Sequence, residues 1–200
     1  MTIPRLIVLE GPDAAGKTTL AKHLACAIGA STYWCTWTPA LNTAMADYQQ
    51  NVIDNARWNI QELGRPMILD RHWPSEWVYG QVFRALDQAQ IGWMCQFDAQ
   101  IKDLGGVYVF CSDSTPVQRR RHAEKPDSRH VYSDHDYTRI CGLYFEWWRR
   151  VMMTTPVYRY CITANGASLD SFTHDFLSDT MSRAYFPKSI RAITPGELCR

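Results

Sequence analysis

The sequence has no apolar run long enough to serve as a membrane span. No stretch approaches the about 18 consecutive apolar residues that a transmembrane helix needs. Residues 1–17 hold a short strand-like run and a glycine loop where a secretory signal would place an apolar helix and a cleavage site. We therefore expect no membrane partner and a cytoplasmic location.

Cysteine pairs, a strong net charge and internal repeats are missing as well. The seven cysteines include no CxxC pair, and their odd count fits neither a disulfide framework nor a structural zinc site. The net charge of +1 creates no overall field that would attract nucleic acid. With no linker and 46% hydrophobic residues, the chain is expected to form one compact domain over residues 1–200.

What the sequence does contain is a complete GxxxxGK[ST] phosphate loop. The loop follows the apolar run 6–9 and precedes a helical pattern over 18–28, which is the strand-loop-helix context that a nucleotide site requires. An ordinary glycine turn would leave the joint presence of both glycines, the lysine and the threonine unexplained. The residues expected to bind the nucleotide are Gly11, Pro12, Asp13, Ala14, Ala15, Gly16, Lys17, Thr18 and Thr19.

Each residue type in this loop has a task in phosphate binding. Gly11 and Gly16 can adopt backbone angles that are closed to other residues, so that successive N–H groups converge on phosphate oxygens. The helix that begins here adds its own partial positive charge. Lys17 is expected to contact the β- and γ-phosphates as a catalytic cation, and the Thr18 hydroxyl is expected to hold Mg²⁺. The expected cofactors are therefore ATP and Mg²⁺.

Strand-like and helical segments alternate along the chain. The strand-like runs are 6–9, 32–36, 67–69, 107–111 and 157–162, and the expected helices are 18–28, 42–63, 75–86, 91–104, 133–155 and 169–181. Alternation of this kind is typical of a parallel sheet with helices on both faces. The sequence thus predicts an α/β three-layer sandwich with a five-stranded parallel sheet.

The clearest helical pattern lies between residues 133 and 155. Ser133 and Asp136 have the spacing of a capping box at its start. One stripe of the segment carries Tyr137, Ile140, Cys141, Tyr144, Trp148, Val151 and Met152. This spacing predicts an amphipathic helix.

Two segments resemble the thymidylate kinase and deoxynucleoside kinase superfamily. Residues 9–20 look like the opening of thymidylate kinases, whose loop carries an acidic residue where this chain has Asp13. Residues 69–72, followed by Ser75 and Tyr79, resemble the DR[YH] motif at the end of the third strand. Segment 70–80 is also similar to thymidylate-kinase-like proteins of bacteriophages, for which the location would be the host cytoplasm. The resemblance implies the P-loop NTPase kinase fold.

Asp70 and Arg71 are candidate catalytic residues outside the loop. Both lie where a central strand is expected to end, and ligands of open parallel sheets bind at that edge. Asp70 would organise Mg²⁺ or accept the acceptor's proton, and Arg71 would hold the acceptor or the transferred phosphate. The alternative is an ordinary surface ion pair that closes the strand.

The resemblance also implies a helical lid at approximately 119–135. In the family, arginines of this region approach the phosphates during transfer, where cations stabilise the charge that develops. Successive arginines of a helix point in different directions, so at most two of the three at 119–121 can face the site. Arg119 and Arg121 are the two expected to be catalytic.

The second strand departs from the family pattern. Family members carry Glu-Pro at its end, whereas this chain has Thr38-Pro39. The glutamate that acts as base in deoxynucleoside kinases is therefore missing at that position, and Asp70 is the best substitute. Candidate acceptor contacts are Asp13, Trp37, Arg71, Trp73 and Tyr79, with core packing as the alternative for the aromatic side chains.

Taken together, the residues predict a kinase that transfers the γ-phosphoryl group of ATP to a thymidine-type pyrimidine deoxynucleotide. A first rival keeps the fold and phosphorylates a hydroxyl, that of 5-hydroxymethyluracil in phage DNA. A second rival is a non-catalytic nucleotide-binding switch, which should lack a substrate motif such as Asp70-Arg71. The expected partners are a small deoxynucleotide acceptor or DNA carrying a modified pyrimidine, and a homodimer is compatible with each hypothesis.

Overall fold

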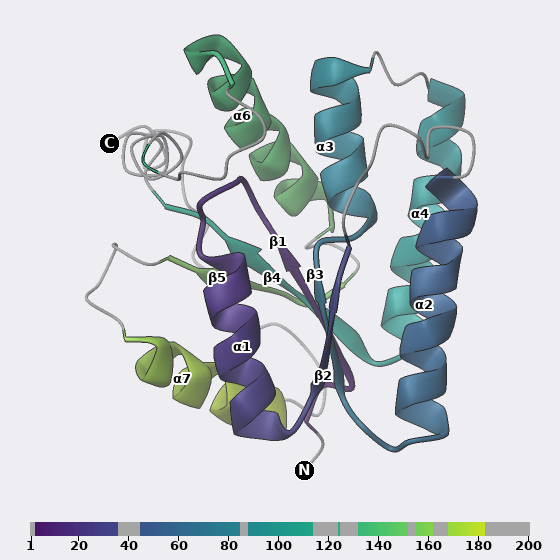
Figure 1. Cartoon of the computed structure of the whole chain (residues 1–200), viewed down its shortest axis with the longest axis vertical. Coiled ribbons are helices and arrows are strands. Elements are labelled where there is room, and N and C mark those ends of the chain that lie inside the picture. The colour runs from purple at the N-terminus through teal and green to yellow at the C-terminus, as the bar shows by residue number, and fades with distance from the viewer. Residues whose placement is uncertain are drawn as a thin grey trace.

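Five parallel strands form the central sheet in the computed structural model of the chain (Figure 1). The strands are β1 (Leu6–Glu10), β2 (Ser31–Trp34), β3 (Met67–Asp70), β4 (Gly106–Cys111) and β5 (Val157–Tyr160). The structure describes residues 3–35, 45–84, 88–113, 124, 132–151, 155–161 and 168–182. The predicted five-stranded parallel sheet is confirmed.

Helices cover both faces of this sheet. Figure 1 shows α1 (Lys17–Ile28) and α7 (Leu169–Ser182) on one face. The opposite face carries α2 (Met45–Gln61), α3 (Trp73–Phe83), α4 (Gln88–Asp103) and α6 (Asp134–Val151). The predicted α/β three-layer sandwich is thus confirmed, while the single domain over 1–200 stays a prediction. Among the described helices, none is both long and apolar enough to cross a membrane.

β1 lies at the centre of the sheet, where the order in which successive strands are added reverses. The strand order is β2-β3-β1-β4-β5, so β2 and β3 lie on one side of β1 and β4 and β5 on the other. Leu9 pairs with Asp70 of β3, and Glu10 pairs with Phe110 of β4. Ligands of open parallel sheets bind at the carboxyl edge beside such a switch point. The phosphate loop and Asp70 therefore meet at that edge.

The strand residues alternate between two hydrophobic cores. Ile7 and Leu9 of β1 pack toward α1 and α7, whereas Leu6 and Val8 pack toward the helices of the other face. All four side chains are fully buried. This burial on both faces is why the central strands are apolar throughout instead of alternating with polar residues. A charged residue that ends such a strand, as Glu10 does, needs specific partners.

The helix α6 confirms the capping box and most of the predicted stripe, of which Cys141 is half-buried and Met152 lies outside the described residues. Ser133 Oγ accepts the N–H of Asp136 at 3.1 Å and donates to its carboxylate at 2.6 Å. The buried residues of α6 are Tyr137, Ile140, Tyr144, Trp147, Trp148 and Val151. Trp147, which the predicted stripe left out, is one of the largest fully buried side chains. α6 thereby brings two tyrosines, Tyr137 and Tyr144, toward the end of β1.

Gly11 is the loop position with the least space for a side chain. Its φ is 143°, and a Cβ there would lie 2.0 Å from the carbonyl oxygen of Cys111. Gly64 also has positive φ, at 64°, but a Cβ there would meet no atom within 4 Å. The close approach of two backbones at Gly11 therefore adds a steric penalty to the conformational one.

We predict that Gly11→Ala destabilises the protein far more than the control Gly64→Ala. The control should cost about 1 kcal/mol, because it carries only the penalty of positive φ. Gly11→Ala must also displace β4 or the loop, which should raise the loss to more than about 3 kcal/mol. Urea unfolding of both variants measures the difference, and equal losses would contradict the geometry.

Candidate active site at the carboxyl edge of the sheet

The phosphate loop connects β1 directly to α1. Gly16 forms the N-cap of α1 with φ 77° and ψ 12°, and Ala14 has φ 62°. These left-handed residues turn the chain sharply, so that the helix N-terminus points its N–H groups at the space above β1. The predicted strand-loop-helix context is therefore present. Thr19, the last predicted nucleotide contact, has an exposed side chain.

Lys17 is folded onto its own loop. Its ammonium donates to the carbonyl oxygens of Gly11 at 2.8 Å and Pro12 at 2.6 Å. The side chain is buried, and this burial, together with the positive charge of Arg71, lowers the pKa of Lys17 to about 8. A buried ammonium of this kind gains strongly from an anionic ligand, because phosphate oxygens restore the charge compensation that water would provide.

Thr18 and Asp70 are in direct contact at the start of α1. The Thr18 hydroxyl donates to Asp70 Oδ2 at 2.7 Å. The other oxygen, Asp70 Oδ1, is buried and has no hydrogen-bond partner within the described residues. A hydroxyl beside a carboxylate with a spare oxygen is an oxygen donor set that suits Mg²⁺. No group of three or more His, Cys, Asp or Glu that could hold a metal ion occurs in the described part of the chain.

The Arg71 guanidinium lies over the phosphate loop. Its Nη1 donates to the Gly11 carbonyl at 3.2 Å and to the hydroxyls of Ser75 and Tyr144, each at 2.9 Å. Its Nη2 forms an ion pair with Asp13. The backbone of Arg71 has φ 76°, which is unusual for a residue other than glycine. A strained backbone position at a sheet edge is typical of functional sites.

Asp13 links the loop to the beginning of α6. Its carboxylate accepts a hydrogen bond from the Tyr132 hydroxyl at 3.0 Å, and its backbone carbonyl accepts one from Tyr137 at 2.9 Å. The same carboxylate binds Arg71, so one loop residue fixes both the guanidinium and the segment that enters α6. Burial raises the pKa of both tyrosines, which keeps them neutral donors.

Aromatic rings flank Arg71 on the side of α3. The guanidinium carbon lies 5.2 Å from the centre of the Tyr79 ring. Tyr79 stacks on Phe83 at 6.3 Å, and Phe83 stacks on Tyr132 at 5.3 Å. Phe83 is 48% exposed, so this group keeps an accessible aromatic side chain next to the ring that contacts Arg71. Such a side chain suits the ring of a planar ligand.

Glu10 is a site residue that the sequence analysis did not select. It ends β1 and is fully buried, and burial raises its pKa to about 7 although Arg71 lowers it. Its carboxylate accepts the His72 N–H at 2.6 Å and the Ser75 hydroxyl at 2.7 Å. The signal was available in the sequence, because a charged residue that ends an otherwise apolar strand needs a partner.

The remaining predicted site residues fall into two groups. Trp73 lies in the core, with its indole N–H donating to Tyr108 at 2.9 Å and its ring against Trp147. Both the ring and its polar atom have partners in the core, which favours the core-packing alternative, while the role of Trp73 as an acceptor contact stays a prediction. Trp37, Arg119, Arg121 and most of the lid at 119–135 lie outside the described residues.

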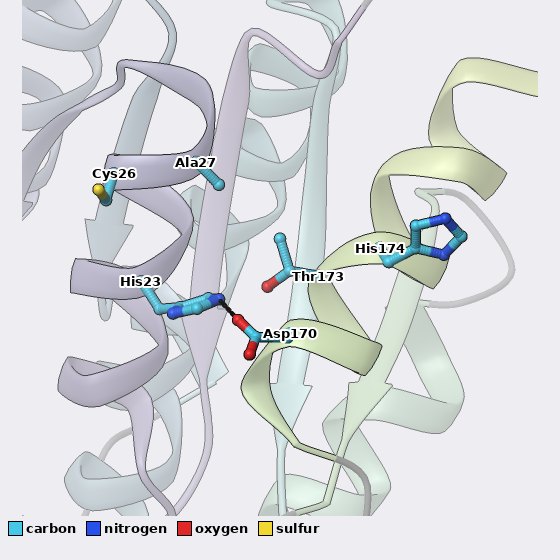
Figure 2. Close-up of a pocket in the computed structure, with 6 residues that line it drawn as sticks. All are labelled: His23, Cys26, Ala27, Asp170, Thr173 and His174. Carbon is cyan, nitrogen blue, oxygen red and sulfur yellow. Dashed lines mark ion pairs between the residues drawn. The ribbon is translucent and has the colours of Figure 1, made fainter.

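A separate hollow of about 330 Å³ lies between α1 and α7 (Figure 2). It is lined by His23, Cys26, Ala27, Asp170, Thr173 and His174. His23 and Asp170 form an ion pair at 3.1 Å across it, and Figure 2 shows His174 directed away from that pair. The α1 residues that line this hollow lie in the C-terminal half of the helix, whereas the phosphate loop leads into its N-terminus. The hollow is therefore distinct from the candidate active site.

Several solved structures share this architecture. The YorR protein of Bacillus subtilis, in complex with phosphorylated GDP, has a TM-score of 0.62 and 22% identity over 88% of this chain and 95% of its own. Deoxyadenosine kinase from M. mycoides with bound dCTP has a TM-score of 0.57 and 14% identity over 87% and 99%. Shikimate kinase from Acinetobacter baumannii in complex with shikimate has a TM-score of 0.55 and 15% identity over 90% and 94%.

These likenesses define the class of the fold. The chain has the α/β fold of the P-loop kinases, with the phosphate loop at the carboxyl edge of the sheet. No protein-family model and no curated protein sequence matches it. At identities of 14–22% these structures establish the fold alone.

The lowered pKa of Lys17 predicts a pH-dependent nucleotide affinity. Only the charged ammonium attracts phosphate, so the Kd of Mg·ATP should be constant below the pKa of about 8 and rise about tenfold per pH unit above it. Calorimetric titrations between pH 7.5 and 9.5 measure this, and the control Lys22→Gln should show the same inflection. A Kd that stays constant up to pH 9.5 would contradict the role of Lys17.

Proposed function

We propose that this protein is an ATP-dependent kinase whose acceptor is a thymidine-type pyrimidine deoxynucleotide. The observation that carries the proposal is the convergence of Lys17, Asp70 and Arg71 at one sheet edge, beside the phosphate loop. Transfer of a phosphoryl group depends mainly on positioning and on cations that stabilise the transferred charge. Lys17 and Arg71 supply two such cations, and both donate to the carbonyl oxygen of Gly11.

Lys17, Thr18 and Asp70 form the donor side of this proposal. Lys17 would contact the β- and γ-phosphates, and Thr18 and Asp70 would hold Mg²⁺. When bound, the metal ion neutralises charge on the transferred phosphoryl group. Asp70 Oδ1, which is buried without a partner among the described residues, is also available to accept a proton from the acceptor.

Arg71 and the aromatic group beside it form the acceptor side. A guanidinium offers a planar fork of donors that matches a phosphate, which favours a nucleotide over a nucleoside as acceptor. The half-exposed ring of Phe83, which packs against Tyr79 and Tyr132, is the candidate contact for a base. The choice of a thymidine-type base follows from the resemblance of segments 9–20 and 69–79 to thymidylate kinases.

An acceptor screen with radiolabelled ATP tests this function. The acceptors are the deoxynucleoside monophosphates, the corresponding nucleosides, and DNA that carries 5-hydroxymethyluracil. The proposal expects transfer to dTMP above the other acceptors. Label in the modified DNA alone would favour the hydroxyl kinase, and ATP binding without transfer to any acceptor would favour the nucleotide-binding switch.

Replacing Asp70 by Asn should separate its chemical role from its structural one. The variant keeps the size and the contact with Thr18 but loses the negative charge, so turnover should fall about 10²-fold or more. The control Asp54→Asn removes an exposed carboxylate of α2 and should change turnover less than twofold. Unchanged kinetics of Asp70→Asn across the pH range would assign Asp70 to structure.

Arg71→Ala should affect the acceptor far more than ATP. The variant loses charge-assisted contacts worth about 1.5–3 kcal/mol each, so acceptor KM should rise more than about tenfold while ATP KM changes little. Arg57→Ala, at a half-buried arginine of α2 that pairs with Asp54, is the matched control. If Arg71→Ala instead weakens ATP binding and spares the acceptor, the assigned orientation of the site is reversed.

A further inference from the structure

Glu10 is the last acceptor in a chain of hydrogen bonds that begins at Arg71. Arg71 Nη1 donates to the hydroxyls of Ser75 and Tyr144. The Ser75 hydroxyl then donates to Glu10 Oε2 at 2.7 Å, and the Tyr144 hydroxyl lies 3.4 Å from the same oxygen. The Ser75 hydroxyl also lies 2.8 Å from the hydroxyl of Tyr144. Its single proton is directed to Glu10, which leaves its lone pairs to accept from Arg71.

The second carboxylate oxygen of Glu10 fixes the backbone that follows Arg71. Glu10 Oε1 accepts the N–H of His72 at 2.6 Å. His72 comes directly after the left-handed turn at Arg71, where φ is 76°. A buried amide at this turn needs an acceptor, and Glu10 provides it. The two oxygens of one side chain thus hold both the turn and the guanidinium.

We infer that Glu10 is a positioning residue that holds Arg71 for the acceptor through Ser75, Tyr144 and the amide of His72. This inference rests on the proposed function, in which Arg71 contacts the acceptor. Glu10 is fully buried and bonded to protein groups through both oxygens, so it acts through Arg71 and not on a substrate. No other buried carboxylate of the described residues accepts a hydrogen bond from Ser75.

Protonation of Glu10 should turn one of its hydrogen-bond acceptors into a donor. Burial raises the pKa of Glu10 to about 7, so its proton leaves within the neutral range. Below that pH the protonated oxygen donates, competes with the Ser75 hydroxyl and weakens the hold on Arg71. Above it the carboxylate accepts both bonds. Acceptor affinity should therefore rise as the pH rises through about 7. The other titratable groups that face Glu10 are Arg71, Lys17, Tyr144, Cys35, Tyr108 and Cys111.

The test compares Glu10→Gln with the wild type in steady-state kinetics between pH 6 and 8.5. Glutamine keeps the acceptor for His72 but places an amide donor against Ser75. At pH 8, acceptor KM of Glu10→Gln should rise about tenfold, the factor expected for one charge-assisted hydrogen bond, while kcat and ATP KM stay within about twofold. The wild-type inflection near pH 7 should be missing from the variant. Using one acceptor for both proteins cancels the titration of its own phosphate.

Two further variants distinguish positioning from packing. Ser75→Ala removes the link, so it should raise acceptor KM like Glu10→Gln, and the double variant should add little more. Glu76→Gln is the matched control, because Glu76 is also buried but pairs with Arg84 at 2.6 Å. If Glu76→Gln gives the same KM rise and loses the same inflection, or if Ser75→Ala leaves KM unchanged, the inference is overturned. If Glu10→Gln fails to fold, the acceptor KM of Ser75→Ala alone tests the inference.

A readout without turnover separates this inference from the proposed function. The side-chain NMR signal of Arg71 and the amide signal of His72 should titrate near pH 7 in the wild type and lose that titration in Glu10→Gln. If both signals behave in this way but no acceptor is phosphorylated, the proposed function fails and the positioning role of Glu10 stands. If neither signal responds to Glu10→Gln, the positioning role fails whatever the activity.

Discussion

The Arg71 guanidinium joins the phosphate loop, α3 and α6, and the rest of the site depends on how this partly buried charge is compensated. Asp13 provides the ion pair, while Ser75 and Tyr144 accept hydrogen bonds. Asp13 lies in the phosphate loop, Ser75 in α3 and Tyr144 in α6. The shared contact with Arg71 therefore fixes how these three segments are placed relative to one another. A partly buried guanidinium that lost one of these partners would keep an incompletely compensated charge, which is more costly than a lost surface contact.

The carboxylates at this sheet edge have separate tasks. Asp13 and Glu10 are bound up with Arg71 and its neighbours, whereas Asp70 faces Thr18 and keeps one oxygen without a partner among the described residues. Because other groups compensate the charge of Arg71, the carboxylate of Asp70 lies free of that ion pair at the N-terminus of α1, where the phosphates are proposed to bind. Lys17 shares the Gly11 carbonyl with Arg71, and its pKa is lowered by burial and by the charge of Arg71. Because burial disfavours the charged ammonium, a bound anion that compensates this charge should be held strongly.

Much of this arrangement is readable in the sequence, because it is local. The phosphate loop between strand and helix, the DR motif at a strand end and the capping box at Ser133 each need only a few neighbouring residues, and the fold they predict is the one observed. Contacts across the fold were not readable. Tyr132 and Tyr137 contact Asp13 across more than a hundred residues of sequence. The helical pattern includes Tyr137 but does not indicate that either tyrosine contacts Asp13. Trp73 follows the motif in sequence, yet its indole N–H finds Tyr108 in the core.

A crystal structure with Mg²⁺ and a non-hydrolysable ATP analogue tests the central claim most directly. The account predicts the triphosphate in the loop of residues 11–18, with Lys17 Nζ on phosphate oxygens and the metal ion beside Thr18 and Asp70. Arg71 should remain between Asp13 and Tyr144 on the acceptor side. Phosphates bound elsewhere, or a Lys17 ammonium that makes no phosphate contact, would contradict the account.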